Sequence, residues 1–260
     1  MINIDIDTTQ ETRYEQNWYS PKTEWERPRI KMCKLPDYYS FDLEKLRQEV
    51  ELLKEDFPFK PFVLTPDGRK RLTYEGLCLT SRPNIENPEY DGMRLFAYED
   101  APSNTNEIHI RDTFKTYFGE GTEGPDKLPV LNEKLFNTPT KAYRGYIAEV
   151  INKFHTTTTK CRLLNLRPRG VVPAHVDFPY YQQIRVHAAI YSNDDVWFQI
   201  EGEKFQIPAD GNFYWFDTGR NHAVTNQGSE DRLTLSVNLS VYEHYTSQDD
   251  LIDLINQAKI

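Results

Sequence analysis

The chain has 260 residues, which is enough for one substantial hydrophobic core or for a core domain with a large appendage. Its formal net charge is −9, so we expect no binding to nucleic acid, because contact with a phosphate backbone needs clustered Lys and Arg. The three cysteines are widely spaced and form no CxxC pair, which argues against a disulfide framework and a thiolate zinc site and favours a reducing compartment.

The start of the chain and its apolar segments indicate where the protein resides. The first residues lack the basic start and the apolar run of a signal peptide. No stretch approaches the ~20 apolar residues that are needed to cross a bilayer. We therefore expect a cytoplasmic protein that does not contact membranes.

Residues 1–155 are predicted to form an α/β extension that packs on the rest of the chain. Apolar residues recur at helical spacing from Phe41 to Glu55, which predicts a helix there. Short apolar runs at 77–79 and 108–110 are candidate strands. A second helix is predicted from Pro139 to Phe154, because proline is favoured at the first position of a helix.

Residues 156–245 have the pattern of an all-β core. Short apolar or alternating segments are separated by turn residues, which is typical of a β-sandwich or a barrel. The predicted strands are 184–191, 196–200, 204–207, 212–216 and 232–241. A helix at 246–260 is predicted to close the chain, and we expect the three parts to form one compact unit.

Two of these strands alternate in polarity, with apolar side chains on one face and polar side chains on the other. The polar side chains are Arg185 and His187 in the first predicted strand, and Arg232, Thr234, Ser236 and Asn238 in the last. A polar face of this kind meets solvent or lines a ligand cavity inside a barrel, and the pattern alone favours neither.

The chemically distinctive residues are His175 and Asp177, which are separated by one residue, and His222 farther along the chain. Two imidazoles and one carboxylate can hold Fe(II) on one face of an octahedron, which leaves three positions for a bidentate co-substrate and O₂. A lone His-x-Asp is weak evidence, since a loop hydrogen bond explains it at least as well. Arg232 adds weight, because a guanidinium on a polar strand face after His222 can clamp a dicarboxylate.

The sequence resembles the aspartyl/asparaginyl β-hydroxylase-like branch of the Fe(II)/2-oxoglutarate-dependent oxygenases, which also includes hydroxylases of free proline and of N-acylated amino acids. The resemblance extends from Cys161 to Tyr242, under a third of the chain. The matching pieces are Arg167-Pro168-Arg169-Gly170, His175-Val176-Asp177, Arg185-Val186-His187, Phe216-Asp217, His222 and Arg232.

The resemblance implies a mainly β protein with flanking helices, built on a double-stranded β-helix of the jelly-roll or cupin-like kind. It implies Fe(II), 2-oxoglutarate and O₂ as cofactors. The implied roles are metal binding by His175, Asp177 and His222, binding of 2-oxoglutarate by Arg232, and a position close to this co-substrate for Arg185 and His187.

The carboxylate among the implied metal ligands, Asp177, gives information about the class of substrate. Members of this branch that hydroxylate protein domains lack the carboxylate ligand, whereas Asp177 is present here. The resemblance therefore points to the hydroxylases of small molecules, and away from the related halogenases, which vacate this position for halide. Residues 1–150 contain no motif that matches the family, so they give no information on the substrate.

Further residues near the ligand pair are candidates for substrate contact. Between residues 160 and 187, five basic side chains accompany one acid, Asp177, and form either a solvated strand edge or a mouth that attracts carboxylates. The basic residues are Lys160, Arg162, Arg167, Arg169 and Arg185, of which we favour a functional role for Arg167 and Arg185. Tyr180, Tyr181 and Gln183 are candidates as well, although packing explains the aromatic rings equally well.

The leading hypothesis is a dioxygenase that hydroxylates a C–H bond of a free or modified amino acid. A hydroxylase of peptide or protein side chains is the first alternative. A cupin-like metal protein or enzyme that does not use 2-oxoglutarate is the second, and a binding module without activity is the third. Formation of succinate that depends on 2-oxoglutarate separates the first two hypotheses from the others.

Overall fold

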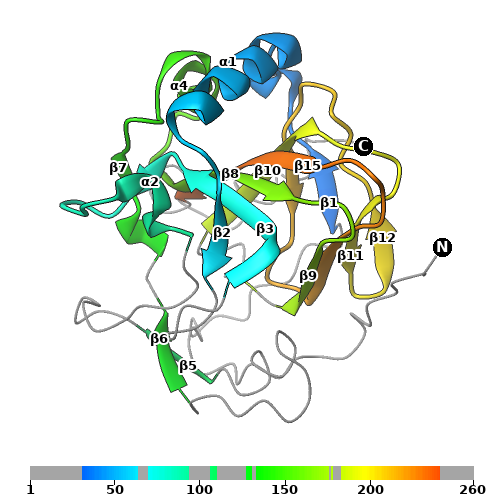
Figure 1. Cartoon of the computed structure of the whole chain (residues 1–260). Helices are drawn as coiled ribbons and strands as arrows, with labels where there is room; N and C mark the ends of the chain where they lie inside the picture. Colours follow the sequence, from blue (N-terminus) through cyan, green and yellow to red (C-terminus); the bar gives the residue numbers. More distant parts are fainter. Residues whose placement is uncertain are drawn as a thin grey trace.

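The computed structural model describes residues 31–63, 70–93, 106–109, 127–130, 133–175, 177 and 183–240 (Figure 1). Its helical elements are η2 (Asp37–Tyr39), α1 (Leu43–Asp56), α2 (Pro88–Asp91), η3 (Glu133–Leu135) and α4 (Gly145–Ile151). The strands that precede the core are β1 (Met32–Lys34), β2 (Lys60–Val63), β3 (Lys70–Cys78), β4 (Thr80–Ser81), β5 (Asn106–His109), β6 (Lys127–Val130) and β7 (Thr138–Pro139). The core strands are β8 (Thr158–Leu166), β9 (Val171–His175), β10 (Gln183–Tyr191), β11 (Val196–Ile200), β12 (Glu203–Phe205), β13 (Tyr214–Phe216), β14 (His222–Asn226) and β15 (Arg232–Ser240).

The eight core strands form two antiparallel sheets. Strands β13, β10, β15 and β8 are neighbours in that order within a seven-stranded sheet, and β12, β11, β14 and β9 form a four-stranded sheet. The chain passes back and forth between the sheets, so that strands consecutive in sequence are in general not neighbours. This winding is the double-stranded β-helix, and it confirms the predicted mainly β fold with flanking helices.

The two sheets pack on each other through an apolar cluster at one end of the interior. Phe198 of the four-stranded sheet stacks on Phe216 of the seven-stranded sheet, with ring centroids 4.5 Å apart. Leu166, Ile200 and Val224 are buried in the same cluster. This packing joins the two sheets.

The seven-stranded sheet is buried on both faces. Leu233, Leu235 and Val237 of β15 belong to the cluster that also contains buried residues of α1 and α4, the two helices that lie together above the sheet (Figure 1). The other face carries Arg232 and Thr234, which are also buried. The polar face predicted for this strand therefore lines the interior and does not meet solvent.

Strands from the first half of the chain extend the same sheet. Strand β1 pairs with β13, and β3 pairs with β8. The predicted boundaries at 155/156 and 245/246 stay predictions, and the helix predicted at 246–260 lies outside the described residues. In the described part of the chain, no helix combines the length and the apolar character that a membrane span requires.

The helix predicted from Pro139 to Phe154 is wrong in its start. Strand β7 uses residues Thr138–Pro139 to pair with β4, and α4 begins only at Gly145, which has a φ of +53°. The prediction failed because the backbone of 138–140 is taken up by cross-strand bonds, among them Thr140 N–H to the carbonyl of Leu79 at 2.9 Å.

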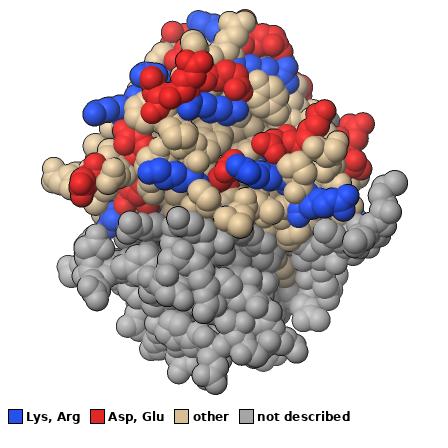
Figure 2. All heavy atoms as spheres, in the orientation of Figure 1, with Lys and Arg blue, Asp and Glu red and all other residues tan. Residues whose placement is uncertain are grey.

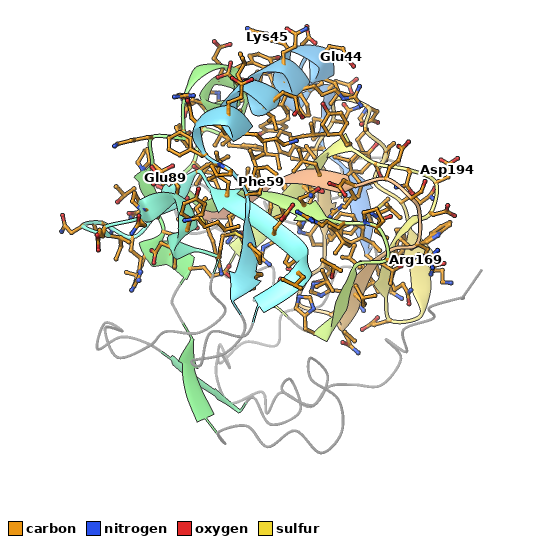
Figure 3. The ribbon with its side chains drawn as sticks, viewed as in Figure 1. Glu44, Lys45, Phe59, Glu89, Arg169 and Asp194 are labelled. Carbon is orange, nitrogen blue, oxygen red and sulfur yellow. The ribbon has the colours of Figure 1, made fainter. Side chains whose placement is uncertain are left out.

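Charged side chains on the outer surface pair locally. Figure 2 shows Lys and Arg next to Asp and Glu over the described part of one face. Glu44 and Lys45 project outward from α1 (Figure 3), and Lys45 lies 3.4 Å from Glu149 of α4. Such exposed pairs contribute about 0–1 kcal/mol each, so the fold depends on its buried contacts.

We predict that Leu235→Ala lowers the free energy of unfolding by about 2–5 kcal/mol, because it leaves a cavity between β15 and the covering helices. Leu235 is 0% exposed, whereas Leu72 in β3 is 72% exposed. Leu72→Ala is the matched control and should change the stability by less than about 0.5 kcal/mol. Urea denaturation measures both, and equal losses would contradict this account of the core.

Candidate functional site

The four-stranded sheet and the segment after β9 bring the predicted metal ligands together. His175 is the last residue of β9 and His222 is the first residue of β14, and the two are direct cross-strand partners. Asp177 is anchored by its own backbone, because its N–H donates to the carbonyl of Thr218 at 2.8 Å. Two distant parts of the sequence thus meet at one edge of the sheet.

The three side chains form a compact donor set. One ligand atom from each of His175, Asp177 and His222 lies within 4.8 Å of the others. Nε2 of His175 is 4.0 Å from Oδ1 of Asp177, and Nε2 of His222 is 3.8 Å from Oδ2. Two imidazole nitrogens and one carboxylate at this separation fit a divalent ion of the Fe(II) type, with coordination positions left for other ligands.

His222 is prepared to bind a metal. Its Nδ1 lies 2.9 Å from the carbonyl of Arg220, and a carbonyl can only accept, so Nδ1 carries the proton and Nε2 keeps its lone pair. Burial and, to a lesser degree, the neighbouring His175 lower the pKa of His222 to about 3. The imidazole is therefore neutral at physiological pH, which is the form that coordinates metals.

Asp177 is held by an arginine on the inner face of the seven-stranded sheet. Arg185 of β10 donates from Nη1 to Oδ2 of Asp177. Burial raises the pKa of the Asp177 carboxyl, but the charges of Arg185, His175 and His222 outweigh this effect and leave the pKa below its usual value. Asp177 is thus ionised, and one oxygen is oriented by Arg185.

A glutamate from outside the core strands completes this network. Glu133 of η3 accepts from Nη2 of Arg185 at 2.5 Å and from Nδ2 of Asn238 at 2.8 Å. Asn238 in turn accepts from Nε of Arg185 at 2.9 Å. The other oxygen of Glu133 accepts from Nζ of Lys160. A chain of charge-assisted bonds therefore runs from Lys160 through Glu133 and Arg185 to Asp177.

Glu133 was not singled out by sequence reasoning. It lies in an unremarkable Asn-Glu-Lys segment, before the part of the chain that resembles the hydroxylases. A signal existed in the excess of basic residues on the core strands, because buried cations require an acid somewhere in the chain. Burial raises the pKa of Glu133, but Arg185 and Lys160 more than offset this and keep it well below the usual value.

Arg232 stands apart from this network. It is 3% exposed, its guanidinium carbon lies 4.8 Å from the ring centroid of Phe198, and its Nη2 has no hydrogen-bond partner. Burial lowers its pKa to about 10, so it stays charged. A buried guanidinium with an unused donor is costly unless a ligand pairs with it, and a carboxylate fits this requirement.

His187 lies between the network and Arg232. Its ring packs against both Phe198 and Phe216, with centroid distances of 5.9 Å and 5.7 Å. Burial, together with the charges of Arg232 and Arg185, lowers its pKa well below the usual value, so the ring is neutral. Its Nδ1 is buried without a partner, which leaves one polar position for a ligand.

The predicted basic cluster divides into separate environments. Lys160, Arg162 and Arg185 are buried. Arg167 forms a bidentate pair with Glu75, at 3.0 Å from Nε and 2.8 Å from Nη2, and its side chain is 53% exposed. These residues therefore do not form one continuous basic mouth. A role of Arg167 in substrate binding stays a prediction.

The remaining substrate candidates follow the ligand pair. Tyr180 and Tyr181 lie outside the described residues. Gln183 begins β10, where its backbone pairs with Ser240, but its side chain is not among those described. Their contact with a substrate stays a prediction.

We predict that Glu133→Gln weakens metal binding roughly tenfold, because partners that orient metal ligands typically contribute 10–100-fold to affinity. Without the second carboxylate, the charge of Arg185 acts on Asp177 alone and competes with the metal for it. Anaerobic calorimetric titration with Fe(II), repeated with Mn(II), measures this effect.

Glu149→Gln is the matched control, since Glu149 is 63% exposed on α4 and pairs only with the surface residue Lys45. It should bind the metal like the wild type. Unchanged metal affinity in a folded Glu133→Gln protein would show that Glu133 has no part in orienting the ligands.

Comparison with known proteins gives a family match. Residues 127–240 match the family Aspartyl/Asparaginyl beta-hydroxylase. No curated protein sequence matches the chain.

Several solved structures are similar at low identity. An oxidoreductase of the 2OG-Fe(II) oxygenase family from Burkholderia pseudomallei has 13% identity and a TM-score of 0.44, with 82% of this chain and 85% of that chain covered. A Cupin_2 domain of an XRE family transcriptional regulator from Enterobacter cloacae has 17% identity and a TM-score of 0.27, over 32% of this chain and 80% of its own. A predicted oxalate decarboxylase from Thermotoga maritima has 20% identity and a TM-score of 0.25, over 32% and 67%.

The matched segment contains the whole donor set and the buried Arg162, Arg185 and Arg232. The match covers less than half of the chain, and it supports the resemblance to the aspartyl/asparaginyl β-hydroxylase family that the motifs carry.

Proposed function

We propose that this protein is an Fe(II)- and 2-oxoglutarate-dependent dioxygenase that hydroxylates a C–H bond of a free or modified amino acid. The observation that carries the proposal is the pairing of two features in one interior. A metal donor set of His175, Asp177 and His222 lies at the edge of one sheet, and a buried arginine with an unused donor, Arg232, lies on the other.

The metal would be held by the two imidazoles and Asp177. When bound, iron supplies the coupled oxidation of 2-oxoglutarate to succinate and CO₂ and of a substrate C–H bond to an alcohol, with O₂ as oxidant. The protein fixes the ligands beforehand, because Arg185 orients Asp177 and the carbonyl of Arg220 sets the tautomer of His222.

The co-substrate would pair its far carboxylate with Arg232. The guanidinium can form two parallel hydrogen bonds with a carboxylate, and its position against Phe198 excludes water from them. His187 offers one further polar position beside it. Arg185 is bonded to Asp177, Glu133 and Asn238, so we assign it to holding Asp177. Contact between its remaining N–H groups and the co-substrate stays a prediction.

The substrate is proposed from the ligand set and from the family. Asp177 is present, as in the hydroxylases of small molecules that the sequence resembles. An amino-acid-like substrate is therefore our first choice, and a peptide or protein side chain is the second. Substrate contact by Arg167, Tyr180, Tyr181 and Gln183 belongs to this proposal and awaits a test.

A cupin-type enzyme without 2-oxoglutarate is the competing candidate. Such an enzyme needs the metal ligands but has no use for a buried guanidinium with an unused donor in the same interior. Arg232 therefore favours the oxygenase, since an apolar residue would be more stable at this position in a protein that binds no anion there.

The proposed function is tested by succinate formation. The Fe(II)-loaded protein is incubated with 2-oxoglutarate and O₂ and a panel of amino acids, N-acylated amino acids and short peptides. We expect 2-oxoglutarate-dependent succinate that rises with one class of compound, together with a product that is heavier by one oxygen atom. Metal binding without any succinate would favour the cupin-type alternative.

We predict that Arg232→Lys raises the KM for 2-oxoglutarate by roughly 10–100-fold, from the loss of about 1.5–3 kcal/mol of charged hydrogen bonding. Lysine keeps the charge but cannot form the bidentate pair. Metal content should equal that of the wild type, since Arg232 is not one of the three ligands.

Arg144→Lys serves as the control, because Arg144 is 45% exposed and pairs with Asp56 on the surface. Its KM for 2-oxoglutarate should not change. If Arg232→Lys leaves this KM unchanged as well, Arg232 has a structural role and the cupin-type alternative gains support.

A further inference from the structure

A row of three polar side chains crosses the inner face of the seven-stranded sheet. Arg162 of β8 is the cross-strand partner of Ser236 in β15, and Ser236 is the partner of His187 in β10. Adjacent strands are about 4.8 Å apart, so the three side chains are immediate neighbours. Nε of Arg162, Oγ of Ser236 and Nδ1 of His187 are each buried, and no described residue forms a hydrogen bond with them.

Arg162 is the charged member of this row. It is 5% exposed, and its one hydrogen bond among the described residues goes from Nη1 to the carbonyl of Gly92 at a long 3.4 Å. Its partner on the other side, Cys78 of β3, is no counter-ion, because burial raises the pKa of that thiol to about 12. A buried guanidinium that is bonded so weakly is a position for an anion.

The charges around Arg162 also favour an anion. The buried cations of β8, β10 and β15 are Lys160, Arg162, Arg185 and Arg232, and the carboxylates bonded to this group are Glu133 and Asp177. The other buried acids have partners outside it: Arg167 for Glu75, Arg82 for Asp91, Arg220 for Asp217 and the backbone N–H of Lys141 for Glu89. Four positive groups against two carboxylates leave a net charge of +2. Iron(II) and doubly ionised 2-oxoglutarate cancel each other, so the excess persists when both are bound. A further anion would therefore be attracted to this interior.

Glu133 does not accept a hydrogen bond from Arg162. The two oxygens of Glu133 accept from Lys160, Arg185 and Asn238, and no hydrogen bond joins Glu133 to Arg162 in the described part of the chain. Arg162 feels its charge only through space. Glu133 thus neutralises Lys160 and Arg185 but leaves the hydrogen-bond donors of Arg162 available.

We propose that Arg162, with Ser236 beside it, forms a second carboxylate-binding position in the interior, separate from Arg232. This inference rests on the proposed function, because it takes the second carboxylate to belong to a molecule that reacts at the metal. The carboxylate has two sources, the amino-acid substrate and the metal-proximal end of 2-oxoglutarate. The charge excess that remains after 2-oxoglutarate is counted favours the substrate.

The test is anaerobic calorimetry on Fe(II)-loaded wild-type protein and on the Arg162→Gln variant. One arm titrates 2-oxoglutarate alone. The other arm, with 2-oxoglutarate saturating, titrates N-acetyl amino acids as free acids and as primary amides, which lack the negative charge. Arg144→Gln is the control, since it removes an exposed arginine from the surface pair with Asp56.

The wild type should bind free acids roughly tenfold or more tightly than the amides, as the loss of a charged hydrogen bond implies. Arg162→Gln should lose this preference and keep the 2-oxoglutarate affinity within about twofold of the wild type, by the same reasoning. If the variant instead binds 2-oxoglutarate roughly tenfold more weakly, the second position serves the co-substrate.

Unchanged binding in both arms overturns the inference and assigns Arg162 to the fold alone. If Arg162→Gln does not fold, Arg162→Lys is measured in the same two arms, and unchanged binding there has the same meaning. The proposed function is judged separately. A wild type that forms 2-oxoglutarate-dependent succinate while Arg162 has no effect refutes only this inference, whereas a wild type that forms none refutes the function.

Discussion

The structure depends on the neutralisation of buried charges by Arg185, Glu133 and Asp177. Arg185 links Glu133 to Asp177, so a glutamate outside the β-helix and a metal ligand share one cation. Taking these groups out of water is expensive, and removing one partner of a buried pair costs about 3–5 kcal/mol because the other charge is left alone. The network therefore fixes the orientation of Asp177 and, with it, the geometry of the candidate metal site.

The interior has an apolar part and a charged part. The apolar part stabilises the fold, and the charged part surrounds the candidate site. In the apolar part, stacked rings such as Phe198 and Phe216 join the sheets. His187 of β10 and Arg232 of β15 contact these rings, and Arg185, also on β10, belongs to the network with Asp177 and Glu133. The rigid apolar part holds the strands in register, so the polar side chains keep their positions before any ligand arrives.

The sequence allowed the β-helix, the cluster of His175, Asp177 and His222 and the inward-facing position of Arg232 to be predicted, because each has a local signature. A His-x-Asp pair, a distant histidine and an alternating strand are visible within short windows. Glu133 and the start of α4 were not predictable in this way. Glu133 acquires its role only through contacts with strands 27 or more residues away, and residues 138–140 are held by pairing with β4.

The position of Glu133 also bears on how this protein can be divided or recombined. Glu133 precedes the first strand of the β-helix, and β3 is hydrogen-bonded along β8. A fragment that began at residue 156 would retain the three metal ligands yet carry Lys160 and Arg185 without Glu133, their shared counter-charge. The barrel is therefore not a transferable module. A chimera that exchanges segments of this chain must keep η3 and β3 together with the barrel.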